Sequence, residues 1–211
     1  MPTPIGHALA GLAVWSMARK PASLKEAFTR ENAGWAALCV LAANLPDADF
    51  INLTGGGLTV SGRYHHGLTH SIGFAILVGA LAGGWAWMRR ASREPGLRPM
   101  APDPIAVFHL TSLCILTHVS LDVFSVDTYA PNGIGLPLLW PLDGSNFIVP
   151  WIDGVDRTDY FTVKSAVIIA KETLSLGALF LVVTLYAARR ADIKRGASPE
   201  MAKETVTESS S

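Results

Sequence analysis

The stretch that decides the fold of this chain is YHHGLTHSIGFAILVGALAGGWAWM, residues 64–88. It places three of the six histidines directly before the uncharged, apolar run 72–88. Such a run approaches the roughly 20 residues that a helix needs to cross a bilayer, and imidazole is the commonest metal ligand in proteins. His66 and His70 would share one face of a helix, whereas His65 and His70 converge only if the helix begins between them. The stretch predicts a membrane helix whose start carries either metal ligands or histidines that merely cap it.

The composition favours a membrane protein. Half of the 211 residues are hydrophobic and only 16% are charged, against about 25% charged in soluble proteins. A formal net charge of zero gives no reason to expect a nucleic-acid partner. Cys39 and Cys114 lie in apolar runs without zinc-finger spacing, so we expect buried, reduced thiols. The first residues lack a basic segment, so we do not expect a cleaved signal peptide.

Other apolar runs predict four further helical segments, over residues 5–18, 33–45, 104–124 and 163–188. The spacing of Ser23 and Glu26 is that of a capping box, which predicts that the second segment begins near Ser23. Asp103 is expected to cap the fourth. We therefore predict an all-α, polytopic membrane bundle of four to five helices with a long irregular outer loop. Residues 1–190 would form the membrane-embedded domain and residues 191–211 a disordered cytoplasmic tail.

The basic residues predict the orientation of the bundle. Twelve Lys and Arg residues lie in segments 19–30, 89–98 and 189–195, and three lie in the opposite loops. Cytoplasmic loops carry an excess of Lys and Arg. We therefore expect a multi-pass protein of the cell inner membrane with an outer N-terminus. Lys171 and Glu172 interrupt the last apolar run and would snorkel or pair within the bundle, while Trp140 and Trp151 would anchor the interface.

This orientation gathers most of the unusual polar residues at the outer face. The group comprises five of the six histidines and three aspartates: His7, Asp47, Asp49, His65, His66, His70, His118 and Asp122. Ionisable residues at membrane depth are costly and usually face a bundle interior or a cavity. Four separate segments contribute to the group, which favours a shared metal site on the non-cytoplasmic side.

The residue types indicate which metal chemistry such a site would support. His118 and Asp122 share a helix face, so they would bind one divalent ion or form a structural hydrogen bond. Mixed imidazole and carboxylate ligands suit zinc, manganese or iron. Seven or eight candidate ligands exceed the needs of one zinc and indicate two ions, an arrangement used in phosphoester hydrolysis. The chain has no G-x-S-x-G motif, so water activated by a metal is the better nucleophile hypothesis.

Several of these residues lie in motifs of a known family. The matching motifs are GH (6–7), LPDAD (45–49), HHGLTHS (65–71), His118-x3-Asp122 and PNGIGLPLLWP (131–141). On these motifs the chain resembles the YdjM-type inner-membrane proteins, a family described as metal-dependent hydrolases. Family members commonly have Arg where this chain has His66. The resemblance therefore implies that His65 and His70 are ligands and that His66 supports them or faces a phosphate.

The complete hypothesis is a membrane-bound hydrolase that uses zinc, or alternatively manganese, as one or two ions. The expected ligands are His7, Asp47, Asp49, His65, His70, His118 and Asp122. Asp49 and His65 would also act in catalysis, with His66 and Thr69 supporting the ligands. The expected substrate is an ester, in first place a phosphoester, of a membrane lipid. Two alternatives stay open: a metal-binding or metal-transporting membrane protein without hydrolase activity, and a scaffold whose His–Asp network is structural.

Overall fold

The computed structural model describes residues 2–21, 26, 29–52, 59–60, 65–125, 135–155 and 161–196. Its helices are α1 (Pro4–Arg19), α3 (Arg30–Asn44), α4 (Ile72–Ala91), α5 (Pro104–Phe124) and α6 (Val163–Gly196). Short 3-10 turns are η1 (Pro46–Phe50), η3 (Leu68–His70) and η4 (Pro95–Met100), and β1 (Ile51–Asn52) pairs antiparallel with β2 (Thr59–Val60). The predicted all-α bundle is confirmed, and the small β pair is an addition to it.

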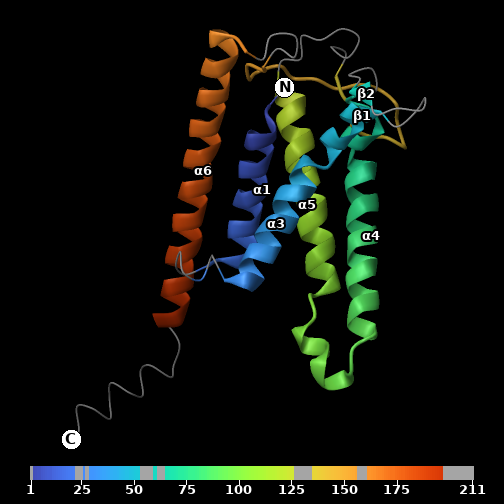
Figure 1. Cartoon of the computed structure of the whole chain (residues 1–211), viewed down its shortest axis with the longest axis vertical. Helices are drawn as coiled ribbons and strands as arrows, with labels where there is room; N and C mark the ends of the chain where they lie inside the picture. The colour runs from blue at the N-terminus through green and yellow to red at the C-terminus, as the bar shows by residue number, and fades with distance from the viewer. Residues whose placement is uncertain are drawn as a thin grey trace, which may run out of the picture.

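The helices pack around α5 (Figure 1). It contacts α4 on one side and α3 and α1 on the other, while α6 packs chiefly against α1. Small residues allow close contact between the helices, as is usual where lipid supplies no hydrophobic driving force. A Cβ on Gly11 of α1 would lie 2.6 Å from the Cys39 carbonyl oxygen of α3, and one on Gly83 of α4 would lie 3.0 Å from the Pro104 carbonyl oxygen.

Side-chain caps fix where most of these helices begin. The Ser71 hydroxyl accepts the Phe74 N–H at the start of α4, and the Asp103 carboxylate accepts the Ala106 N–H at the start of α5, as predicted. The second helix begins later than predicted, because the Thr29 hydroxyl accepts the Asn32 N–H and starts α3 at Arg30. Ser23 lies outside the described residues.

The last helix is longer than expected. It continues past residue 188 to Gly196 and takes in the beginning of the predicted tail. Residues 189–195 include good helix formers and no proline or glycine, so nothing local ends the helix before Gly196. The rest of that tail and residues 131–134 of the family motif lie outside the described residues.

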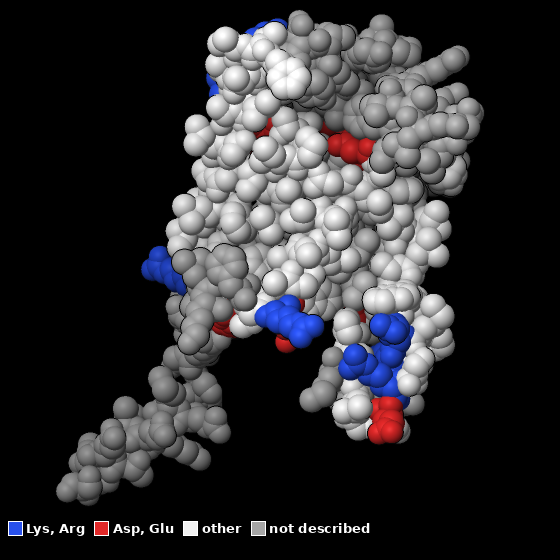
Figure 2. Space-filling model, in the orientation of Figure 1, with Lys and Arg blue, Asp and Glu red and all other residues white. Residues whose placement is uncertain are grey.

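Three of the helices are long and apolar enough to cross a bilayer: α4, α5 and α6 over its Val163–Arg190 part. The described α1 and α3 have 16 and 15 residues and are shorter than a full span. On the face shown in Figure 2, a broad band without charged side chains separates charged groups near the two ends of the bundle. This pattern fits a lipid bilayer around the middle of the molecule.

Candidate metal centre

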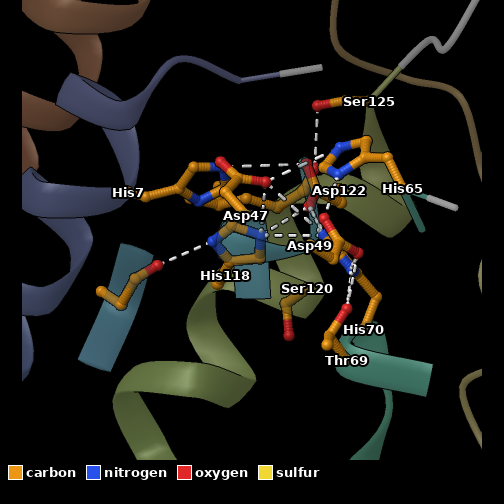
Figure 3. A network of polar contacts seen from close by, with 12 residues as sticks. His7, Asp47, Asp49, His65, Thr69, His70, His118, Ser120, Asp122 and Ser125 are labelled. Atoms are coloured by element: carbon orange, nitrogen blue, oxygen red, sulfur yellow. Dashed lines mark hydrogen bonds and ion pairs between the residues drawn. The ribbon is translucent and has the colours of Figure 1, made fainter. Parts of the chain in front are cut away.

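The candidate site lies where several helix ends meet. The first turn of α1 supplies His7, and the last turn of α5 supplies His118 and Asp122. Because α3 ends at Asn44 and Pro46 starts η1, the two aspartates of that turn follow immediately. The η3 turn before α4 supplies His70, preceded by His65. Figure 3 shows side chains from these separate segments pointing toward one another.

Four ligand atoms form the heart of the cluster. Asp47, His70, His118 and Asp122 each offer one atom, all within 4.8 Å of one another. From His118 Nε2 the distances are 2.9 Å to Asp122 Oδ2, 3.2 Å to His70 Nε2 and 3.4 Å to Asp47 Oδ1. His70 Nε2 lies 3.4 Å from Asp122 Oδ2 and 3.7 Å from Asp47 Oδ1. Ligands at zinc bond lengths of 2.0–2.1 Å lie about 3.3 Å apart in a tetrahedron, so the spacing fits a zinc ion.

The hydrogen bonds behind these imidazoles determine which nitrogen faces the centre. His118 Nδ1 lies 2.7 Å from the Ala43 carbonyl oxygen, so Nδ1–H donates to it and Nε2 of the neutral ring carries a lone pair. That lone pair points at Asp122 Oδ2, which is itself an acceptor. Both Asp122 carboxylate oxygens and Asp47 Oδ1 are buried, and ring nitrogens of His70 and His118 lie 2.9–3.7 Å from Asp122 Oδ2 and Asp47 Oδ1. Buried carboxylates that converge in this way require either protons on these rings or a cation.

Asp49 lies behind two of the histidines. Its Oδ1 is 2.6 Å from His65 Nδ1, and its Oδ2 is 3.4 Å from His70 Nδ1 and accepts a 2.6 Å hydrogen bond from the Thr69 hydroxyl. A carboxylate that holds the outer nitrogen of a ligand histidine fixes the orientation of the ring. Asp49 is therefore placed to orient the rings of His65 and His70. Its predicted roles as a metal ligand and a catalytic group stay predictions. Thr69 contacts both Asp49 and His70, and its supporting role stays a prediction.

The electrostatics of the turn residues agree with this arrangement. Burial would raise the pKa of Asp49, but hydrogen bonds with His65 and His70 outweigh it and hold that pKa well below its usual value. Burial lowers the pKa of His65 to about 4, despite the opposing hydrogen bond to Asp49. His65 is therefore neutral at pH 7, the form that binds metals.

His70 behaves in the opposite way. Burial alone would lower the pKa of His70, but the carboxylates of Asp122, Asp47 and Asp49 raise it well above its ordinary value. A divalent cation at the centre would supply the positive charge that these carboxylates attract, so its binding would displace the His70 proton.

The remaining two histidines surround this core. His7 is fully buried, stacks on the His118 ring at 3.6 Å between centroids, and places Nε2 3.7 Å from Asp122 Oδ1. His66 is buried in a turn with φ of 64°, outside any helix, so the shared-helix-face interpretation of His66 and His70 is wrong. Their rings nevertheless meet edge-on at 4.9 Å, because the turn folds His66 back onto His70.

The structure also reveals contacts that the sequence did not indicate. The Ala43 carbonyl oxygen that orients His118 belongs to the last turn of α3, and a backbone acceptor has no sequence signal. Glu172 of α6 accepts a 2.8 Å hydrogen bond from the Thr3 N–H, four residues before His7. The only signal for that contact was a carboxylate within an apolar run. His109 is exposed, bonds to the Ile105 carbonyl oxygen and lies outside the cluster, as expected.

Comparison with known protein families matches residues 1–195 to the YdjM inner membrane protein family. The chain belongs to this family. No curated protein and no solved structure gives a significant match. The YdjM description states a membrane location and no reaction, so the chemistry of this YdjM protein must be argued from its centre.

Proposed function

We propose that this YdjM protein is a membrane-bound, metal-dependent hydrolase that acts on an ester, in first place a phosphoester. The observation that supports this most strongly is the convergence of ligand atoms from Asp47, His70, His118 and Asp122, all within 4.8 Å of one another, with the carboxylate oxygens buried. Two buried carboxylates this close together need positive charge between them, which a divalent cation would supply.

The donor set fits a zinc ion, with manganese as the alternative. Two imidazole nitrogens and two carboxylate oxygens lie within 4.8 Å of one another, whereas Mg²⁺ and Ca²⁺ prefer oxygen ligands throughout. His7 Nε2 lies 3.7 Å from Asp122 Oδ1 and His65 Nε2 lies 3.6 Å from Asp47 Oδ1, so these residues would be available to hold a second ion. We therefore propose one or two ions.

A divalent metal at this centre would supply Lewis acidity and make water nucleophilic near neutral pH. The chain's own groups would orient the reactants. Asp49, which stays ionised, accepts His65 Nδ1–H and turns His65 Nε2 toward the centre. In this position His65 would either bind the metal or take a proton from water, as a general base must lie within hydrogen-bond reach of that proton.

The proposed orientation puts the centre on the non-cytoplasmic side. The centre lies at the beginnings of α1 and α4, while Arg19, Arg89 and Arg90 lie at the ends of these helices. Basic residues mark the cytoplasmic side, so the reaction would occur at the outer leaflet. A site at that depth would meet lipid esters before soluble ones.

The first experiment measures metal content and hydrolysis in the same protein samples. Wild type in detergent is compared with Asp122→Asn and with Asp103→Asn, a matched control on the exposed N-cap of the same helix, where Asn also caps well. We expect stoichiometric zinc or manganese and cleavage of bis(p-nitrophenyl) phosphate in wild type and in the control. Both should be lost in folded Asp122→Asn.

The alternatives predict different results. Metal bound at full stoichiometry without cleavage of phosphodiesters, phosphomonoesters or carboxylic esters would favour the metal-binding or transport function. Folded wild type that neither contains metal nor takes it up would refute the metal centre and leave the network structural.

A further inference from the structure

A cavity of about 370 Å³ lies beside the metal centre, between α5 and α6. Leu121 of α5 lines one wall, and Trp151, Ile152 and Asp153 of the irregular segment 135–155 line another. Its volume falls in the range of small-molecule sites, about 300–1,000 Å³. The space exists because α6 packs chiefly on α1 rather than on α5.

One face of α6 forms the opposite wall. Ile168, Lys171, Glu172, Ser175 and Leu176 line the cavity at spacings of three and four residues, which place them along one side of the helix. The only two charged residues of the apolar part of α6, residues 165–188, are on this side. Other α6 residues, such as Leu174 with 74% exposure, face outward as lipid-facing residues would.

The two charged residues differ in how they are satisfied. Glu172 Oε1 accepts the Thr3 N–H at 2.8 Å. The ammonium of Lys171 has no ion pair in the described part of the chain and borders the cavity from within a candidate membrane span. A cation in a membrane span usually marks a ligand site or finds an anionic partner, because leaving it alone there is costly.

The cavity also adjoins the proposed metal ligands. Leu121, in its wall, directly precedes Asp122 on α5. Glu172, in the opposite wall, comes so close to the α1 backbone at Gly6 that any side chain there would collide with it, and His7 is the next residue. A molecule in the cavity would therefore lie beside the chain segments that carry two of the ligands.

We propose that this cavity binds the hydrocarbon chain of a phosphate-bearing membrane lipid, with the lipid phosphate held by Lys171. The apolar part of the wall matches the chain, and the location between membrane helices gives access from the bilayer. Two carboxylates, Asp153 and Glu172, also line the cavity, but neither forms an ion pair with Lys171 in the described part of the chain, so the ammonium matches the phosphate. The substrate role of this lipid rests on the hydrolase function proposed above, whereas its binding does not. The proposal narrows the substrate class to lipids that combine a long chain with a phosphate near the metal centre.

The test measures lipid binding separately from hydrolysis. Native mass spectrometry of delipidated protein in detergent is recorded with added dioleoyl phosphatidylglycerol, with dioleoylglycerol, which lacks the phosphate, and with glycerol phosphate, which lacks the chains. Only the phosphatidylglycerol should bind tightly. Lys171→Met should weaken its binding about tenfold, the usual scale for losing a charge-assisted hydrogen bond. Lys164→Met, which removes an exposed charge elsewhere on α6, should not.

A second pair of variants tests the cavity itself. Ser175→Trp fills it and should abolish phosphatidylglycerol binding, whereas Leu174→Trp, on the outward side of α6, should leave binding unchanged. In the hydrolysis assay, Lys171→Met should raise the KM for a phospholipid, whereas Leu174→Trp should leave that KM as in wild type. Lys171→Arg should restore lipid binding.

The outcomes separate this proposal from the proposed function. Lipid binding that depends on Lys171 and Ser175, in a protein that hydrolyses nothing, would support the lipid site and refute the enzyme. The opposite result would be a protein that hydrolyses phosphodiesters but whose lipid binding and KM for lipid are unchanged in Lys171→Met and Ser175→Trp. That result would refute the lipid site and leave the hydrolase function standing. Equal binding of phosphatidylglycerol and dioleoylglycerol would refute the role of Lys171.

Discussion

Replacing Thr69 with Val isolates the contribution of the supporting layer to metal affinity. The Thr69 hydroxyl donates to Asp49 Oδ2 at 2.6 Å and its oxygen lies 3.0 Å from His70 Nδ1. Val keeps the shape and the β-branch but removes both contacts. Asp49 would then have to orient His70 alone, over a distance of 3.4 Å.

The expected loss can be estimated from similar supporting groups. Removing the partner of a metal-bound histidine lowers metal affinity by about 10- to 100-fold, or about 1.4–2.7 kcal/mol. At metal concentrations far above Kd the same amount is lost from the free energy of unfolding, because bound metal stabilises the folded state by RT ln(1 + M/Kd), where M is the concentration of free metal. For a chain of this length that corresponds to a Tm lower by about 3–10 °C with metal present.

The assay is a competition for zinc between the protein and a calibrated chelator, together with thermal unfolding with and without metal. Thr69→Ser is the matched control, because it retains the hydroxyl, and should bind within about threefold of wild type. If Thr69→Val binds zinc as tightly as wild type, the Thr69–Asp49–His70 chain does not tune the metal, and the reasoning fails.

Three further predictions follow from other parts of the structure. His7→Phe keeps the ring stacked on His118 but loses Nε2, so metal content measured by mass spectrometry should fall; unchanged content would limit His7 to packing. Because the carboxylates around His70 raise its pKa well above the ordinary value in the metal-free protein, metal binding should release a proton, and metal affinity should rise with pH between 6 and 8. An indicator dye in weak buffer measures that release, and pH-independent affinity would contradict the assigned protonation. Gly11→Ala should lower the free energy of unfolding by about 1–3 kcal/mol, because its Cβ would meet the α3 backbone. Gly84→Ala on α4 is the control, since open space surrounds this position, and it should be neutral or stabilising. Equal denaturant midpoints for the two variants would show that α1 and α3 separate easily.

Much of the bundle follows from the sequence alone. Apolar runs and caps predicted both ends of α1, α4 and α5 to within three residues, and Asp103 caps α5 as expected. The start of α3 was missed because Thr29 also suits a helix N-terminus, and Ser23, near which the start was predicted, lies outside the described residues. Local sequence patterns fix the ends of helices poorly.

The sequence predicted which residues belong to the site better than it predicted how they are arranged. The directions of the helices were enough to place His7, His70 and Asp122 at the same side of the membrane, because these directions decide which helix ends meet. What the sequence lacked were turn conformations: His66 lies in a left-handed turn before the helix, not on it. The orienting bond from His118 to the Ala43 carbonyl oxygen depends on the crossing of α3 and α5, which no local motif encodes.

The hydrogen bond from Thr3 to Glu172 links residues 169 positions apart, and this has a consequence for biogenesis. As the chain emerges from the ribosome, His7 is made early, yet Glu172, which accepts the hydrogen bond at the start of the helix that carries His7, is made only with α6. Until α6 enters the membrane, the first turn of α1 lacks this tether. Stable loading of the proposed metal would then be a late event in maturation, and truncation before residue 172 would leave the start of α1 without this hydrogen bond.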